Sequence, residues 1–296
     1  DSTDQAAMAG KVMSGNGMGI LEAVAPRVHD PAETERSRAN IVEQALGFDG
    51  HTTLYSSEFL FSFAPKSVVM LRDELDRRGV RLEFVVYVRN IAGHAASSYA
   101  QAVKRRMYTG SFREYIDRDA DGPYRMAVRR KLQSLLDRVG SDHLHVLHYD
   151  SVRSRLVPDF CAQVLGVDVN QLELTDLPER VNRSLTGDEI AIVRYMNRSL
   201  VGRKRAHLVG DLIIDHPPFG TPGLSIDQAD YDLLRHYYEA DMEWLNETFF
   251  PDSRQIAVAA DDVRLTDHAD PVAELSERER FVLDLAAQLA NRPTSD

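Results

Sequence analysis

The segment Leu82–Val88 (LEFVVYV) constrains the fold of this chain more than any other part of the sequence. It is almost continuously apolar and rich in β-branched and aromatic residues, which is typical of a strand buried on both faces of a parallel sheet. Parallel strands cannot be joined by a tight hairpin, so each needs a crossover connection, usually a helix. The segment therefore predicts an α/β protein.

The rest of the chain supplies the elements that such a sheet needs. Strand-like runs occupy residues 52–55 and 144–147, and helical periodicity predicts helices over 32–47, 65–78, 91–107 and 125–139, with a further helix that follows Tyr149-Asp150 and ends at Gly166. The alternation of strands and helices favours a parallel central sheet flanked by helices, with right-handed crossovers. Beyond residue 170 the pattern is mainly helical, with helices expected over 186–199, 227–249 and 274–291.

We expect one domain over residues 1–296. Residues 1–50 would form an N-terminal helical part, residues 51–170 the core sheet, and residues 171–296 a mainly helical C-terminal extension. Residues 209–224 are rich in Pro and Gly, and we expect an ordered loop that gates an acceptor pocket. The last helix would dock on the core or on a second subunit, so a homo-oligomer is one possible assembly.

Composition excludes several classes of function. The chain has 296 residues and a net charge of −11, which argues against non-specific nucleic-acid binding. Its three basic clusters, at 104–106, 129–131 and 203–205, suit a small anionic ligand or are solvated helix faces. No apolar run is long enough for a membrane span and no signal-peptide pattern opens the chain, so we expect a cytoplasmic protein without a transmembrane segment.

No metal site is expected. The single cysteine, Cys161, excludes a disulfide within the chain and cysteine-based zinc sites, and it reads as a small core residue. His143, His145 and His148 alternate along one strand, and we interpret them as sheet-edge and surface residues.

The candidate ligand-binding residues follow directly after Leu82–Val88. The strand delivers Arg89 to the carboxyl edge of the sheet, where ligands bind in doubly wound proteins. A helix follows at once, with Asn90 as a candidate N-cap, and Ser97 lies eight residues after Arg89. A guanidinium beside a helix N-terminus is well suited to a phosphate group. The alternative is an Arg that caps a sheet edge and a Ser that packs against a neighbouring helix.

This strand–Arg–Ser arrangement resembles the 3′-phosphate signature of sulfotransferases that use 3′-phosphoadenosine 5′-phosphosulfate (PAPS). Arg89, Ser97 and Tyr99 fit the signature, and the resemblance implies that Arg89 and Ser97 grip the 3′-phosphate. Further segments, 101–104, 112–115, 145–150 with the helix to Val167, and 181–185 with Asn197, are similar to bacterial carbohydrate-type members. The likeness covers roughly residues 50–200. It implies a P-loop-NTPase-like sulfotransferase fold, PAPS as the sulfonate donor and no metal.

The acceptor must lose a proton during sulfonate transfer, so a general base is needed. Glu58 follows the first expected strand, and it looks like the catalytic Glu of carbohydrate and tyrosylprotein sulfotransferases. His94 is the competing candidate, because histidine is the base in cytosolic sulfotransferases. Lys104 and Arg105 could bind an anionic acceptor or the sulfonate, or they could form a solvated face.

One part of the family pattern is missing from the sequence. The 5′-phosphosulfate loop, Lys-Ser/Thr-Gly-Thr/Ser-Thr/Ser after a first strand, does not occur, and the glycine-rich stretch 14–19 lacks its basic residue. Three explanations are open: the loop precedes Asp1, which is the explanation we prefer; residues 14–19 are a degenerate version of it; or catalysis is lost and only a binding role is kept.

We therefore expect a sulfotransferase that moves a sulfonate from PAPS to a hydroxyl acceptor, a small molecule or more specifically a carbohydrate or glycoconjugate. The alternative is a catalytically silent nucleotide- or glycan-binding protein on the same fold. A nucleotide kinase of related architecture is disfavoured by the same missing loop. Without GxSxG, HExxH or GxGxxG motifs, serine hydrolases, zincins and dinucleotide oxidoreductases are disfavoured as well.

Overall fold

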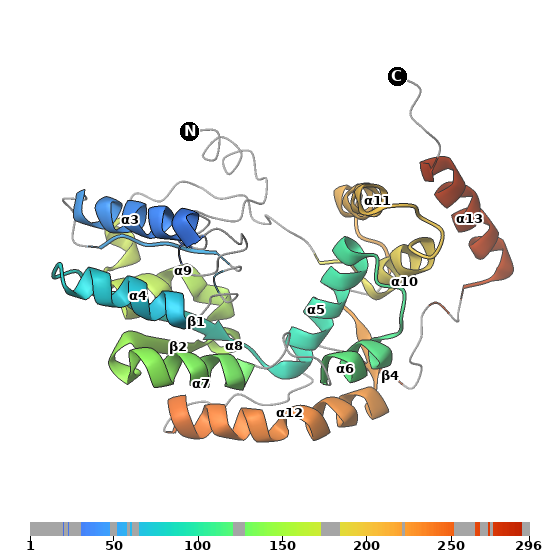
Figure 1. The fold of residues 1–296 in the computed structure, drawn as a ribbon. Helices are drawn as coiled ribbons and strands as arrows, with labels where there is room; N and C mark the ends of the chain where they lie inside the picture. The colour runs from blue at the N-terminus through green and yellow to red at the C-terminus, as the bar shows by residue number, and fades with distance from the viewer. Residues whose placement is uncertain are drawn as a thin grey trace. The chain divides into compact units, whose positions relative to one another are not determined.

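A computed structural model gives the fold of the protein (Figure 1). It describes residues 20, 23, 31–47, 52–57, 60, 65–120, 128–172, 184–220, 223–251, 264–266, 272 and 275–291. The chain divides into two compact units, Asp1–Val88 with Arg129–Val181, and Arg89–Val128 with Asn182–Asp296. Each unit thus contains two separate stretches of sequence.

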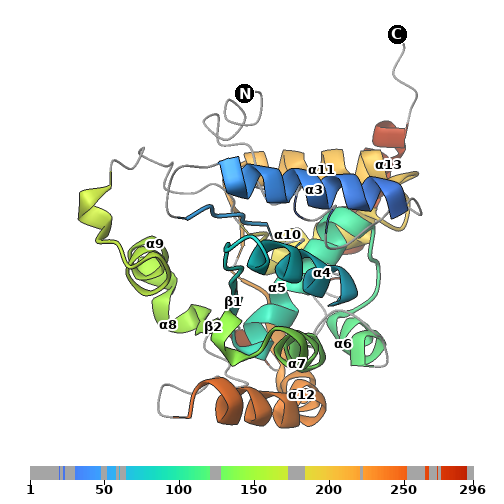
Figure 2. The same ribbon diagram turned by 60° about the vertical axis from the view of Figure 1, so that its left-hand side comes forward.

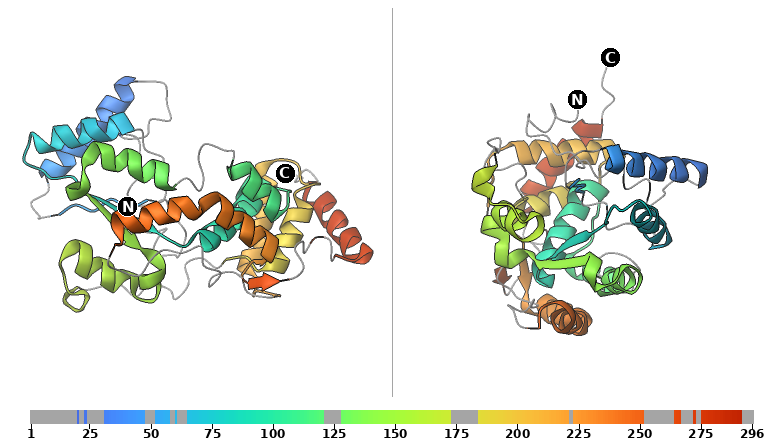
Figure 3. Two further views of the ribbon diagram at one scale, coloured as in Figure 1. Left: turned by 90° about the horizontal axis from the view of Figure 1, so that it is seen from below. Right: turned by 90° about the vertical axis from the view of Figure 1, so that its left-hand side faces the viewer.

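The first unit contains a parallel pair of strands. β1 (Phe84–Val88) pairs with β2 (Leu144–His148), and Val86 lies opposite Val146 in the register. The predicted strands and their parallel pairing are confirmed. Helices α4 and α7 lie on one side of the pair and α8 and α9 on the other (Figures 2 and 3). Of the β1 residues only Val88 is buried and the other four are partly buried, so the strand is less deeply buried than its apolar pattern predicts.

The helices of the first unit are α3 (Pro31–Gly47), α4 (Pro65–Asp76), α7 (Val128–Val139), α8 (Tyr149–Val152) and α9 (Leu156–Phe160). The first three of them begin and end close to where the sequence pattern predicts. Gly79 and Gly140, which follow α4 and α7, both have positive φ angles. Glycine reaches such angles without a steric penalty, which makes it the usual residue after a helix.

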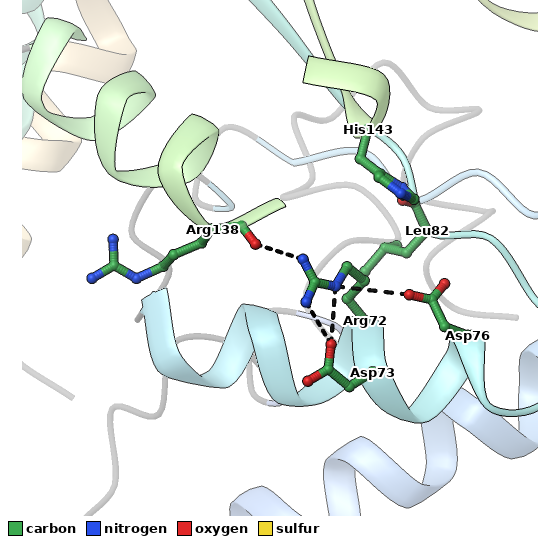
Figure 4. A network of polar contacts seen from close by, with 6 residues as sticks. All are labelled: Arg72, Asp73, Asp76, Leu82, Arg138 and His143. Carbon is green, nitrogen blue, oxygen red and sulfur yellow. Dashed lines mark hydrogen bonds and ion pairs between the residues drawn. The ribbon is translucent and has the colours of Figure 1, made fainter. Parts of the chain in front are cut away.

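Arg72 joins α4 to the end of α7 (Figure 4). Its Nη1 donates a hydrogen bond to the carbonyl oxygen of Arg138 at 2.5 Å, and its Nη2 lies 2.6 Å from Oδ1 of Asp73. Nearby, Nδ1 of His143 lies 2.9 Å from the carbonyl oxygen of Leu82. These contacts fasten the loops that precede the two strands, and they support our interpretation of His143 as a sheet-edge residue.

The second unit is mainly helical. α5 (Ile91–Arg106) packs against α6 (Phe112–Ala120), α10 (Gly187–Met196), α11 (Arg203–Asp215) and α12 (Gln228–Phe249). α13 (Glu277–Asn291) contacts α10, and two short strands, β3 (Ser225–Asp227) and β4 (Arg264–Thr266), pair in parallel. Fully buried side chains from three helices fill the core of this unit, including Tyr99, Ile116, Leu234 and Leu245.

Three sequence predictions need correction. Residues 52–55 form no strand, because this short β-branched run has no partner strand among the described residues. The expected loop over 209–224 is helical as far as Asp215, and the described residues after it, 216–220 and 223–224, are irregular. The single helix expected after Asp150 and up to Gly166 is instead a series of short helical pieces, including 3₁₀ turns at Arg153–Arg155 and a π-helical turn at Cys161–Leu165.

The structure is therefore a mixed α/β protein in which helices dominate and the described sheets have two strands each. In the part of the chain that the structure describes, no helix has both the length and the apolar character needed to cross a membrane. The single-domain organisation remains a prediction, because two compact units can fold together or separately.

Candidate anion-binding site at the start of α5

Arg89 stands at the junction between β1 and α5. β1 ends at Val88, and α5 begins at Ile91, so Arg89 and Asn90 form the whole connection. Arg89 is half-buried. A long cationic side chain can bury its stem in this way while the guanidinium remains able to bind an anion.

Asn90 fixes the start of α5, as the sequence predicts. Its Oδ1 accepts a hydrogen bond from the backbone N–H of Gly93 at 2.7 Å, and its own carbonyl oxygen accepts one from His94 N–H at 3.0 Å. The side-chain cap satisfies one N–H of the first turn. The remaining N–H groups at this helix end and the helix dipole favour a negative charge.

Ser97 lies on the exposed surface of α5. It is six residues beyond Ile91, which corresponds to about 9 Å along the helix axis. His94 is partly buried and lies three residues before Ser97, so the two share one side of the helix. Ser97 is thus accessible to a ligand, and its predicted contact with a 3′-phosphate remains a prediction.

Tyr99 does not line a ligand site. It is 1% exposed, its hydroxyl donates a hydrogen bond to the carbonyl oxygen of Gly110 at 3.1 Å, and it accepts one from Nη1 of Arg194 at 2.9 Å. Edge-on contacts with Tyr108, Phe112 and Tyr115 complete an aromatic cluster. Tyr99 is a core residue of the second unit.

Lys104 and Arg105 lie at the opposite end of α5, about 20 Å from its start. Arg105 forms an ion pair with Asp211 of α11 at 2.6 Å, and its carbonyl oxygen lies 2.8 Å from Nε2 of His207. A Cβ at Gly210 would come within 3.1 Å of Cγ of Lys104, so the two helices pack closely here. These basic residues fasten α5 to α11, and the structure does not bring them together with Arg89.

Asn197, which follows α10, forms hydrogen bonds with the C-terminal end of α5 and the residues just after it. Its Nδ2 donates hydrogen bonds to the carbonyl oxygens of Val103 at 2.8 Å and Tyr108 at 3.3 Å. The last carbonyl groups of a helix lack partners within the helix, and buried ones need donors from elsewhere. Asn197 therefore has a structural role.

Glu58, the predicted general base, lies outside the described residues. The described residues before it, 52–57, have irregular backbone rather than the strand expected to deliver it. Its role remains a prediction.

Sequence reasoning missed three buried charges in the second unit. Glu189 and Arg194 of α10 are 0 and 3% exposed, and Asp230 of α12 is 2% exposed, with its Oδ1 2.8 Å from Nε of Arg113. Burial, reinforced by the nearby Asp227, raises the pKa of Asp230 to about 6 despite the opposing effect of Arg113. The available signal was an Arg at helical spacing among Ile190, Val193 and Met196.

His148 differs from its predicted surface location. It ends β2 but is 8% exposed, and its Nε2 lies 3.4 Å from Oδ2 of Asp150, which is also largely buried. His145, in contrast, is exposed and paired with Glu83 at 3.2 Å. Among the described residues, no group of His, Cys, Asp and Glu side chains is arranged to hold a metal ion.

Comparisons with known proteins found no matching family model, no similar curated protein and no similar solved structure.

Proposed function

We propose that this protein binds a 3′-phosphorylated adenine nucleotide at the start of α5 and is a PAPS-dependent sulfotransferase with a P-loop-NTPase-like fold. The observation that carries the proposal is the junction at Arg89. Arg89 directly follows a strand of a parallel pair and directly precedes a helix whose start is fixed by Asn90. The guanidinium and the helix N–H groups at this junction, with the exposed hydroxyl of Ser97 about 9 Å further along α5, are groups of the kind that bind phosphate.

In this proposal Arg89 and Ser97 hold the 3′-phosphate. That group distinguishes the nucleotide from AMP or ATP, so both residues would determine specificity as well as affinity. The bound donor supplies an activated sulfonate, whose bond to the phosphate breaks as the acceptor oxygen attacks sulfur. Glu58, or else His94, removes the acceptor proton. The acceptor is a hydroxyl of a small molecule or glycan, and the proposal requires no metal.

The positions of Lys104 and Arg105 restrict the acceptors that these two residues could bind. Both side chains take part in the contact between α5 and α11, and both lie about 20 Å from the start of α5. An acceptor that reaches them would have to be long, as a glycan chain is. A small acceptor would be handled without them.

Calorimetric titration with 3′-phosphoadenosine 5′-phosphate tests the proposal. We expect binding that is at least about tenfold tighter than that of AMP, because a charge-assisted hydrogen bond contributes about 1.5–3 kcal/mol. Arg89→Ala should weaken binding of the bisphosphate by about ten- to a hundredfold and leave that of AMP almost unchanged. Arg106→Ala, which removes an exposed positive charge at the other end of α5, is the matched control.

The outcomes separate the alternatives. Equal affinities for the two nucleotides, or equal effects of the two Arg substitutions, would contradict a 3′-phosphate site at Arg89. Specific binding without sulfonate transfer from PAPS to any of a panel of hydroxyl acceptors would instead favour a catalytically silent binding protein.

A further inference from the structure

Helix α13 is attached to the second unit by one of its faces. Ala287 is fully buried in a core that includes Met196 and Leu200 of the α10 region and Ala206 and Val209 of α11. Leu283, Ala286 and Ala290 pack partly buried against the same core. This packing fixes the orientation of α13, and therefore also the direction in which its other face points.

Polar contacts hold the middle and the C-terminal end of the helix in this position. The hydroxyl of Tyr195 donates a hydrogen bond to Oδ2 of Asp284 at 3.2 Å. At the end of the helix, Oδ1 of Asn291 accepts one from Val201 N–H at 2.9 Å, and its Nδ2 donates one to the carbonyl oxygen of Ser199 at 2.7 Å. α13 lies at the rim of its unit (Figures 1 and 3).

The outer face of α13 is apolar and exposed. Phe281, Val282, Leu285 and Leu289 are 68, 55, 48 and 52% exposed, and Val201, next to Asn291, is 64% exposed. The three- and four-residue spacings place the four helical residues on one side, as in the seam of a helix pair. We call these five residues the α13 patch.

The size of the α13 patch matches the apolar part of a protein interface. With 48–68% of each residue exposed, and roughly 150–200 Å² for a large side chain, the patch offers about 450–550 Å² of apolar surface. A standard interface buries about 800 Å² per partner, of which about 56–65% is apolar. The patch alone would supply that apolar share.

The charges around the patch favour a protein partner over a lipid surface. Exposed Glu277, Glu279 and Arg280 present both signs at the start of α13. Helices that lie on membranes carry mainly Lys and Arg on their polar face, and this protein has a net charge of −11. A rim with both signs can pair with a copy of itself, because each charge meets an opposite one when the copies are suitably arranged.

We propose that the α13 patch is the interface of a homodimer, in which α13 packs against α13 of a second copy. A two-fold axis near Leu285 places this residue opposite its own copy, whether the two helices run parallel or antiparallel. The proposal is independent of the nucleotide site.

Sedimentation velocity over a range of concentrations tests it. The unmodified protein should reach twice the chain mass of 33.3 kDa by about 100 µM. Leu285→Lys and Leu285→Glu should each weaken dimerisation by about tenfold or more, because a buried unpaired charge faces its own copy. The control Val157→Lys, at a residue of α9 that is 46% exposed, should leave the dimer intact.

A mixture of the two Leu285 variants gives the sharpest result. Opposite charges across the two-fold axis should restore dimers, which a merely misfolded variant cannot do. A monomeric unmodified protein at about 100 µM, or a dimer unaffected by both Leu285 variants, would overturn the proposal. Circular dichroism shows whether each variant is folded.

Discussion

Some charged side chains in the second unit are buried, and the hydroxyl of Tyr99 accepts a hydrogen bond from one of them, Arg194. Tyr99→Phe removes the hydroxyl that links Nη1 of Arg194 to the carbonyl oxygen of Gly110. We expect a loss of about 1–3 kcal/mol in the free energy of unfolding, measured in urea, because a buried polar contact is lost.

Tyr237→Phe is the matched control for this prediction. Its hydroxyl donates a hydrogen bond to Oδ1 of Asp117 at 3.1 Å, but the side chain is 40% exposed and water can replace the contact. Its loss should cost less than about 0.5 kcal/mol. Equal costs for the two substitutions would contradict a stabilising role of the Tyr99–Arg194 contact.

Asp230 makes the stability of the protein depend on pH in an unusual direction. Its folded pKa of about 6 lies above the ordinary value of 3.8, so the native state binds the proton more tightly than the unfolded state. The stabilising contribution is therefore present below about pH 4 and is lost as pH rises through 6, by an amount on the order of 1–3 kcal/mol.

The comparison with Asp230→Asn isolates this effect. Between about pH 4 and 6, the range that the two pKa values span, the unmodified protein should lose stability relative to the variant. The same denaturation curves at several pH values measure it. If the unmodified protein instead gains stability relative to Asp230→Asn as the pH rises, the ion pair with Arg113 outweighs burial and the folded pKa of Asp230 lies below its ordinary value.

The sequence could place Arg89 between the strand and the helix, and Asn90 at the helix N-cap, because these features are neighbours in the chain. It could not identify Arg194 or Asp230, because their partners Tyr99 and Arg113 lie in other helices. Burial of a charge is a property of the tertiary packing, and local periodicity records it only as a mismatch on an apolar face. Cys161, in contrast, has an apolar neighbourhood in sequence, and its predicted burial is confirmed.

At the scale of elements, the close packing of α11 against α5 depends on Gly210. Gly210→Val should lower the free energy of unfolding by about 1–3 kcal/mol, because its side chain would press on Lys104. Leu212→Val, at an exposed position of the same helix, is the control for the helix propensity of valine. Chemical denaturation of both variants measures the difference, and similar losses would mean that close packing at Gly210 contributes little.

The elements that the sequence predicts well are those with long, unambiguous patterns. β1 and β2 are predicted because each is a compact apolar run, and α5 because Asn90 marks its start. Residues 52–55 mislead because a four-residue β-branched run is too short to specify a strand without a partner. The helical part of 209–224 is missed because Gly210 reads as a loop residue, whereas its function is to let two helices approach.

At the scale of the whole molecule, each of the two units has a core of its own. Leu132 of α7 and Leu234 of α12 are both fully buried, and they belong to the first and the second unit respectively. The chain enters the second unit after Val88 and returns to the first at Arg129, so neither unit is a continuous piece of sequence. This division raises the question of whether the units unfold together.

We expect the units to respond separately to a loss of packing. Leu132→Ala and Leu234→Ala should each cost about 2–5 kcal/mol in the unit concerned, because each leaves a cavity in a different core. Hydrogen exchange followed by mass spectrometry should then show lost protection confined to the unit that carries the substitution. If either variant instead lowers protection evenly in both units, the 296 residues unfold as one cooperative domain, and the single-domain organisation expected from the sequence is confirmed.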